Sequence, residues 1–124
     1  MSIPTSGERL ASLEQLRAAL RQFASDRDWD QFHSPKNLAI ALSVEAAELL
    51  EHFQWTLEAD STGLTPDQHT KVREEIADVL LYLIRLADKL NIDLLAAATD
   101  KIRVNAAKYP VEKARGSSKK YTEL

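Results

Sequence analysis

Hydrophobic residues recur along most of the chain at intervals of three and four, the spacing that places side chains on one face of an α-helix. In the first such stretch they are Leu10, Leu13, Leu16, Leu20 and Phe23. The pattern predicts four main helices, which we expect at about 8–27, 35–57, 66–90 and 94–109. No β-strand of consequence is predicted. The sequence is therefore that of an all-α protein, expected to form a helical bundle of four main helices.

Residues that start and stop helices support these boundaries. Ser34 precedes Pro35, and the run Thr65-Pro66-Asp67-Gln68 repeats that arrangement and adds Gln68 to complete a capping box. A Ser or Thr hydroxyl caps the first turn, and Pro suits the first helical position because its missing N–H is not needed there. Asp93 can cap the fourth helix, which Pro110 stops. The aromatic stretch 28–33, the polar loop 58–64 and the basic tail 111–124 are expected to be irregular.

Acidic residues flank the hydrophobic stripes of the second and third predicted helices. At about 100° per residue, the expected core stripes are Leu38, Leu42, Ala46, Leu49 and Phe53, and then Val72, Ile76, Val79, Leu83, Ala87 and Leu90. Glu45 and Glu48 lie beside the first stripe, and Glu75 and Asp78 lie beside the second. Residues three apart are neighbours on a helix surface. Two antiparallel helices packed through these stripes would therefore bring four carboxylates together.

Four carboxylates beside a core would repel one another, and burying them without a partner would be costly. A divalent cation removes that cost, and an all-carboxylate site without Cys favours the hard ion Mg²⁺, with Mn²⁺ as a substitute. Each acidic pair alone is common on solvated helix faces, so a solvated surface is the alternative. A di-iron bundle would need Glu-x-x-His on each of two helices, and neither helix has it.

Length and composition narrow the class of protein. The 124 residues fit a single domain, 1–124, with 44% hydrophobic and 28% charged residues. A core of this size is often completed by oligomerisation, and Leu81 and Ile84 lie off the expected stripe, which favours an oligomer as well. The net charge of −3 argues against a nucleic-acid binder.

No segment of the sequence resembles a membrane span or a secretory signal. The longest nearly uncharged apolar run, from Val79 to Ile84, is far short of the ~20 residues that a span needs. The first eight residues are mostly polar and lack the apolar stretch of a secretory signal. We therefore expect a soluble cytoplasmic protein.

The arrangement of these motifs resembles a known family. Glu45-Ala46-Ala47-Glu48 followed by Glu75-Ile76-Ala77-Asp78 is similar to the paired acidic motif of the MazG-like all-α pyrophosphohydrolases. Within that family the chain resembles the dCTP pyrophosphatase branch over about residues 12–124. The segments that carry the closer resemblance are 27–33, 35–38, 48–55, 74–83, Lys101 with Asn105, 109–110 and 120–124.

The resemblance implies a fold, a cofactor and a reaction. It implies a helical bundle that dimerises, and in this branch assembles as a tetramer of two tight dimers. It implies that Glu45, Glu48, Glu75 and Asp78 ligate Mg²⁺, and that water attacks the α-phosphorus to release pyrophosphate. Leu20 stands where vertebrate members carry a His that contacts substrate, which leaves the base preference open.

Aromatic residues form the expected base pocket, because nucleobases stack on aromatic faces. The candidates are Trp29, Phe32, His33 and Trp55. Trp55 has the alternative of closing the core at a helix end, and His33 that of a surface residue. Tyr82, one turn beyond Asp78, is expected near the sugar or a ligand carboxylate.

Basic and polar residues near the C-terminus are candidates for binding the phosphates and sugar. Lys101, Asn105 and Lys108 share a face of the fourth predicted helix, and Lys120 lies in the tail. The alternative is a solvated face and an untethered basic tail.

The sequence thus predicts an Mg²⁺-dependent enzyme that hydrolyses a deoxynucleoside triphosphate, dCTP or a modified dCTP, to its monophosphate and pyrophosphate. Glu45 or Glu48 is the expected general base. The same chemistry on dUTP, purine or mixed nucleotides is one alternative. A helical partner-binding module without enzymatic activity is another.

Overall fold

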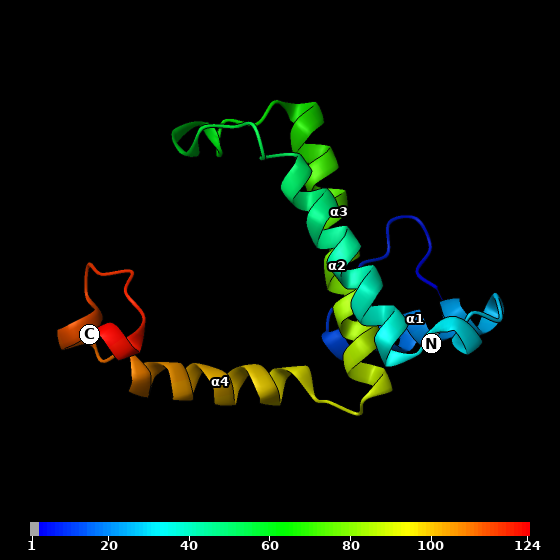
Figure 1. Ribbon diagram of the computed structural model, residues 1–124. Helices are drawn as coiled ribbons and strands as arrows, with labels where there is room; N and C mark the ends of the chain where they lie inside the picture. The colour runs from blue at the N-terminus through cyan, green and yellow to red at the C-terminus, as the bar shows by residue number, and fades with distance from the viewer. Residues whose placement is uncertain (1–2) are drawn as a thin grey trace. The chain divides into compact units, whose positions relative to one another are not determined.

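A computed structural model describes residues 3–124, and the secondary structure of this part is entirely helical (Figure 1). The chain divides into two compact units, Met1–Asn91 and Ile92–Leu124. The all-α class and the four main helices are confirmed. A single domain spanning 1–124 and completion of the bundle by oligomerisation stay predictions.

The first unit holds three of the main helices. They are α1 (Leu13–Asp26), α2 (Pro35–Glu51) and α3 (Pro66–Lys89), with the 3₁₀ turns η1 (Asp30–Phe32) and η2 (Glu58–Asp60) between them. Helices α2 and α3 run side by side in opposite directions, and α1 lies against α3 (Figure 1). The antiparallel hairpin that the acidic motifs required is therefore present.

The predicted helix starts are confirmed by capping hydrogen bonds. The Ser34 hydroxyl accepts from the backbone N–H of Asn37, and Thr65 and Gln68 form a complete capping box. Each cap satisfies a backbone N–H that has no partner inside the helix. Helix α3 ends at Lys89. Asn91 follows with a φ of +55°, in the left-handed region that Asn tolerates.

Two predicted boundaries differ from the structure. Helix α1 begins at Leu13, not near Glu8, because Ser12 caps it by accepting from the N–H of Gln15. Helix α2 ends at Glu51, not near Leu57. After Glu51 the backbone forms tighter turns, in which Phe53 N–H donates to the carbonyl of Leu50 at 2.9 Å. No Gly or Pro signals this end in the sequence.

The buried core is small, and part of the predicted core stripe is wrong for the single chain. On α3, Val72 and Ala87 are buried as expected, whereas Ile76, Leu83 and Leu90 are 53%, 39% and 49% exposed. Periodicity shows which face of a helix is apolar, and the neighbouring elements decide which part of that face is covered. Here α1 and α2 leave the face around Ile76 open.

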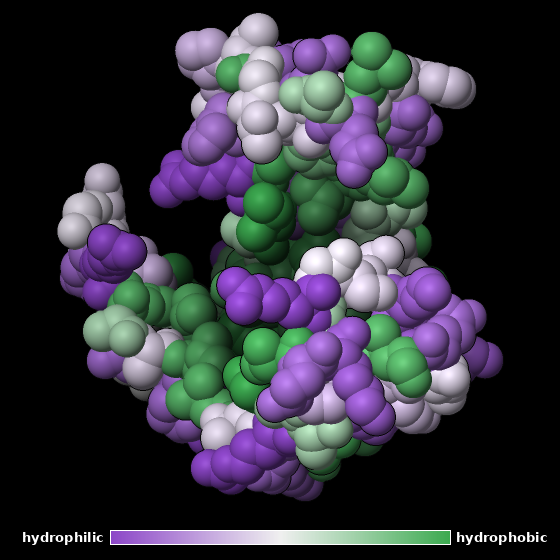
Figure 2. Space-filling model, turned by 90° about the vertical axis from the view of Figure 1, so that its left-hand side faces the viewer, coloured by the Kyte–Doolittle hydropathy of each residue, from purple (hydrophilic) through white to green (hydrophobic). Residues whose placement is uncertain are grey.

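Ile84 was expected to point away from the core, and instead it is buried at 2% exposure within the single chain. Helix α1 packs against α3, and Ala19 and Ala24 of α1 are buried. Ile84 is therefore no argument for an oligomer. The broad hydrophobic areas that reach the surface (Figure 2) carry that argument instead.

The second unit consists of α4 (Leu94–Lys108), the short helix α5 (Val111–Ala114) and the 3₁₀ turn η3 (Tyr121–Glu123). Asp93 caps α4 by accepting from the N–H of Ala96 at 3.0 Å. The basic tail is more ordered than its composition indicated, because Tyr109 and Tyr121 pack edge to face with ring centroids 6.1 Å apart. Among residues 3–124, no helix is both long and apolar enough to cross a bilayer.

Candidate active site

Three of the four predicted carboxylates meet between α2 and α3. Glu45 and Glu48 come from α2, and Glu75 comes from α3. Each is half-buried and offers one carboxylate oxygen, and these oxygens all lie within 4.8 Å of one another. The spacing of three residues places both α2 carboxylates on one side of their helix, and the antiparallel packing brings Glu75 opposite them.

The electrostatics of this cluster call for a cation. Glu45 Oε2 and Glu75 Oε2 are buried with no hydrogen-bond partner. Burial, together with the neighbouring carboxyl groups of Glu75, Glu48 and Asp78, raises the pKa of Glu45 to about 7. A divalent cation would satisfy the partnerless oxygens and remove the repulsion, and hard carboxylate donors fit Mg²⁺ or Mn²⁺. The residues present therefore fit a metal site.

Asp78, the fourth predicted ligand, is not among the carboxylates that converge within 4.8 Å. It lies on α3 and contributes to a neighbouring cavity. Its charge nonetheless acts on Glu45, since it is one of the causes that raise the Glu45 pKa. Asp78 thus stands between the carboxylate cluster and the cavity, and its role as a ligand stays a prediction.

The cavity beside the carboxylates encloses about 300 Å³ and is mostly apolar. Its lining residues are Leu20, Phe23, Ala24, Trp29, His33, Asp78, Leu81, Tyr82 and Arg85. Trp29 packs edge-on against Phe23 and His33, with ring centroids 5.7 and 6.4 Å away. Apolar walls with a few polar groups are the usual make-up of a small-ligand pocket. Three predicted substrate residues, Trp29, His33 and Tyr82, are brought together here.

The other two predicted aromatic residues do not line this cavity. Phe32 is 60% exposed, and Trp55 is 90% exposed in the turns after α2. The alternative that Trp55 closes the core of this chain is wrong. Contact of Phe32 or Trp55 with a base stays a prediction.

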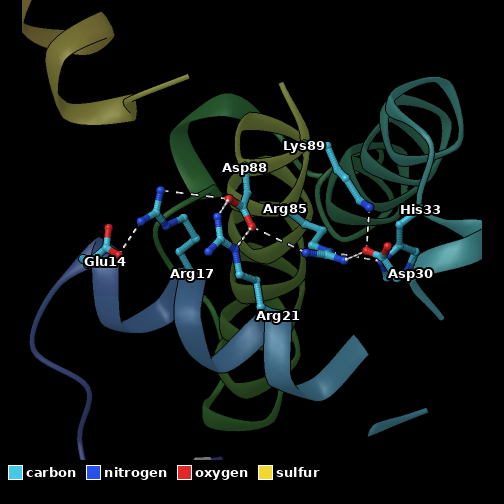
Figure 3. Close-up of polar contacts among 8 residues, drawn as sticks. All are labelled: Glu14, Arg17, Arg21, Asp30, His33, Arg85, Asp88 and Lys89. Atoms are coloured by element: carbon cyan, nitrogen blue, oxygen red, sulfur yellow. Dashed lines mark hydrogen bonds and ion pairs between the residues drawn. The ribbon is translucent and has the colours of Figure 1, made fainter. Parts of the chain in front are cut away.

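Arg85 is a residue of this site that the sequence analysis missed. Arg85 lies on α3 and lines the cavity, and its side chain is only 7% exposed. The guanidinium donates to three partners: Asp30 at 2.6 Å, His33 Nδ1 at 3.2 Å and Asp88 at 3.5 Å (Figure 3). The acidic flank of α3 contained the signal, because Arg85 continues the spacing of Asp78 and Tyr82 by three further residues.

A second ion pair anchors the same side of α3 to α1. Arg21 donates to both carboxylate oxygens of Asp88, at 2.7 and 2.6 Å (Figure 3). This hydrogen-bonded arginine lowers the pKa of Asp88 against the opposing effect of burial. The pair fixes α1, and with it Leu20 and Phe23, over the cavity.

The remaining predicted residues belong to the second unit. Lys101, Asn105 and Lys120 are exposed. Lys108 is half-buried, and its ammonium lies 4.8 Å from the centre of the Tyr121 ring. A cation–π contact of this kind holds the lysine against the unit itself. Binding of phosphate or sugar by these four residues stays a prediction.

Comparison with known proteins adds independent support. Residues 40–124 match the MazG-like family. The chain is 44% identical to dCTP pyrophosphatase 1 of Homo sapiens over 115 residues, which cover 91% of the chain and 68% of that protein. It is 40% identical to dCTP pyrophosphatase 1 of Bos taurus over 123 residues, covering 98% of the chain and 73% of that protein.

A solved structure is similar to this chain in both fold and sequence. The crystal structure of a pyrophosphatase from Archaeoglobus fulgidus DSM 4304 superimposes with a TM-score of 0.76 at 40% identity. The match covers 86% of this chain and 99% of that one.

Proposed function

The chain belongs to the MazG-like family and is a nucleoside triphosphate pyrophosphohydrolase, and we propose that its substrate is a deoxynucleoside triphosphate, most specifically dCTP or a modified dCTP. The products are the monophosphate and pyrophosphate, and the reaction depends on Mg²⁺, with Mn²⁺ as a substitute. Removal of unwanted nucleotides from the precursor pool is the proposed role. Family membership removes the alternative of a module without enzymatic activity.

One observation carries the proposal: partnerless buried carboxylate oxygens lie next to an aromatic cavity. Glu45 Oε2 and Glu75 Oε2 lack hydrogen-bond partners, and Asp78 links their cluster to the cavity that contains Trp29. A cation held by the carboxylates would bind the phosphates of the nucleotide at the carboxylate cluster. The cavity is of a size and make-up that would take the base.

The residues of this chain would divide the work as follows. Glu45, Glu48, Glu75 and Asp78 would hold Mg²⁺, which supplies Lewis acidity and a more acidic bound water. Glu45 or Glu48 would accept the proton of the water that attacks the α-phosphorus, and both remain candidates.

The cavity residues would bind the nucleoside. Trp29 offers an aromatic face to the base, and Tyr82 lies one turn from Asp78 on α3, where its bulk would disfavour a 2′-hydroxyl. Leu20 lines the same cavity, so apolar contact replaces a polar one at this point. Because Leu20 offers no hydrogen bond that would select a base, dUTP, purine nucleotides or several nucleotides are the alternative substrates.

We also propose a homo-oligomer, a dimer or a tetramer. Large apolar residues are exposed on both helices of the hairpin, including Ile40, Val44, Leu50, Ile76 and Leu80. A neighbouring subunit would cover them and bring further residues to the site. The candidates for that contribution are Phe32, Trp55, Lys101, Asn105, Lys108 and Lys120.

A nucleotide panel tests the proposed function. The purified protein is incubated with dCTP, 5-methyl-dCTP, dUTP, dTTP, dATP and dGTP, with Mg²⁺ or with EDTA, and pyrophosphate and monophosphate are quantified. We expect the highest kcat/KM with a cytosine nucleotide and no turnover in EDTA. Equal kcat/KM across the panel would refute the cytosine preference.

Two variants test the metal site within the same assay. Glu48→Gln and Asp78→Asn should each lose turnover by several orders of magnitude while retaining their helical circular dichroism. Glu51→Gln and Glu74→Gln are the matched controls, because both residues are exposed on the same helices, and they should keep wild-type rates. Full activity of Glu48→Gln would remove the carboxylate cluster from the mechanism.

A further inference from the structure

The guanidinium of Arg85 meets the imidazole of His33 in a way that constrains the imidazole. Arg85 Nε–H donates to His33 Nδ1 at 3.2 Å, and both residues line the 300 Å³ cavity. An arginine side chain has donors only and stays charged at all relevant pH values. Nδ1 must therefore be the unprotonated, accepting nitrogen, and the neutral ring carries its proton on Nε2.

The surroundings of His33 keep the ring neutral. Burial lowers its pKa, and the positive charges of Arg85 and Lys89 lower it further, against the opposing carboxylate of Asp30. Asp30 is itself held by Arg85 and Lys89 (Figure 3). Among residues 3–124, His33 Nε2 makes no hydrogen bond, so its N–H is free to meet a ligand in the cavity.

We propose that Arg85 is a positioning residue that holds His33 in the Nε2–H tautomer, so that His33 presents a fixed hydrogen-bond donor to an acceptor atom of the base. The proposal rests on the proposed function, since it takes the cavity as the base pocket. The O2 and N3 atoms of cytosine are neighbouring acceptors. The opposite tautomer would turn a lone pair toward them and repel both.

The ionic network around Arg85 allows this role to be separated from a structural one. Asp88 keeps both hydrogen bonds from Arg21 when Arg85 is replaced, and Asp30 keeps Lys89. Arg85→Met, which retains an unbranched side chain in a buried position, therefore leaves each carboxylate with a cation. Among the three partners of Arg85, His33 Nδ1 is therefore the one that loses its donor without another cation to replace it.

The first experiment reads the tautomer directly. Long-range ¹H–¹⁵N spectra of the labelled protein report the protonation of each ring nitrogen, and His33→Gln assigns the His33 signals against those of His52 and His69. We expect a proton on Nε2 alone in the wild type at neutral pH and a mixture of forms in Arg85→Met. Asp30→Asn, which removes an ion pair of Arg85 without touching His33 Nδ1, should leave the tautomer unchanged. A wild-type ring protonated on Nδ1 would overturn the proposal.

The second experiment is a double-mutant cycle on kcat/KM for dCTP. A glutamine side chain can place its amide N–H near the position of the imidazole Nε2–H and has no tautomers. His33→Ala should lose about tenfold, the upper end of a neutral hydrogen bond, chiefly through KM, and His33→Gln should recover most of it. In the protein with His33, Arg85→Met should lower kcat/KM severalfold. In the His33→Gln background the same change should lower kcat/KM by less than about twofold, because glutamine has no tautomer for Arg85 to select.

The outcomes separate this proposal from the proposed function. An equal cost of Arg85→Met in both backgrounds would make Arg85 merely structural, and an unchanged KM in His33→Ala would remove the donor to the base. The Nε2–H resonance should also shift when dCTP and Mg²⁺ are added, and an unchanged resonance in the bound protein would overturn the proposal. A wild type that hydrolyses no nucleotide, yet shows the Nε2–H tautomer and this shift, would refute the proposed function alone.

Discussion

Glu45 is the residue whose chemistry depends most on its surroundings. Its folded pKa of about 7 lies above the ordinary value of 4.5. Between these values the metal-free native protein therefore binds more protons than the unfolded chain does. Its stability should fall as the pH rises from about 4.5 through about 7 and then level off. A bound cation should reverse this effect, because it favours the charged carboxylates.

Glu45→Gln should flatten this pH dependence. The neutral amide has no proton to lose, so the metal-free variant should exceed the wild type in Tm at pH 8 and gain little from added Mg²⁺. Thermal melts in EDTA and in Mg²⁺ between pH 5 and 8 provide the measurement. Glu51→Gln is the control and should follow the wild type. Parallel pH profiles for Glu45→Gln and the wild type would contradict the assignment.

At this scale the sequence predicted part of the site. Glu45 and Glu48 follow from local spacing alone, and Glu75 follows once the two helices are antiparallel. Arg85 escaped notice because its importance comes from contacts with Asp30 and His33, which are more than 50 positions away. The spacing along α3 places Arg85 on the same flank as Asp78 and Tyr82, but a single sequence does not show which distant residues it contacts.

The elements begin where local chemistry dictates. Ser34, Thr65 and Asp93 cap their helices as predicted, since a cap involves residues only three positions apart. The end of α2 at Glu51 was not predicted, because it depends on turn geometry without Gly or Pro. The coverage of α3 was only partly predicted, because α1 crosses it at a place that periodicity does not reveal.

The clamp between α1 and α3 should carry a measurable part of the stability. Asp88 is 5% exposed and receives two hydrogen bonds from Arg21. Asp88→Asn should lower the free energy of unfolding by about 2 kcal/mol, typical of hydrogen bonds to a charged group, as measured by urea denaturation at pH 7. The pKa of Asp88 is lowered in the folded state, so this contribution is present above the ordinary pKa of 3.8 and is lost as the pH falls through the folded value.

An exposed ion pair supplies the control for this clamp. Asp100 and Arg103 on α4 lie 3.4 Å apart with about three quarters of each side chain exposed. Surface pairs of this kind contribute little, so Asp100→Asn should leave the free energy of unfolding within about 0.5 kcal/mol of wild type. Equal losses in the two variants would show that Asp88 is not a clamp.

At the scale of the molecule, many large apolar side chains of the described residues are exposed, and hydrophobic areas reach the surface in Figure 2. The sequence predicted a modest core and an oligomer, but it located the core on residues such as Ile76 and Leu83, which the single chain exposes. A helical pattern specifies an apolar face without specifying which chain covers it. That is the physical reason why the fold class was predictable and the packing was not.

Ile40→Glu should disrupt the proposed oligomer. Ile40 is 53% exposed on α2, and a charge at this position would be buried without a partner in an interface. Light scattering after size exclusion should show a smaller species than the wild type. Arg73→Glu changes an exposed polar residue of α3 and should leave the mass unchanged. A wild-type monomer would contradict the oligomer itself.

The two tryptophans differ in their surroundings, because Trp29 lies on the wall of the cavity and is 45% exposed, whereas Trp55 is 90% exposed. The protein thereby carries two built-in optical reporters. Quenching of the Trp29 emission would follow entry of a nucleotide, whereas a blue shift of the Trp55 emission on raising the concentration would follow burial by a neighbouring chain. Ligand occupancy and self-association could then be monitored in the same cuvette without attaching a dye.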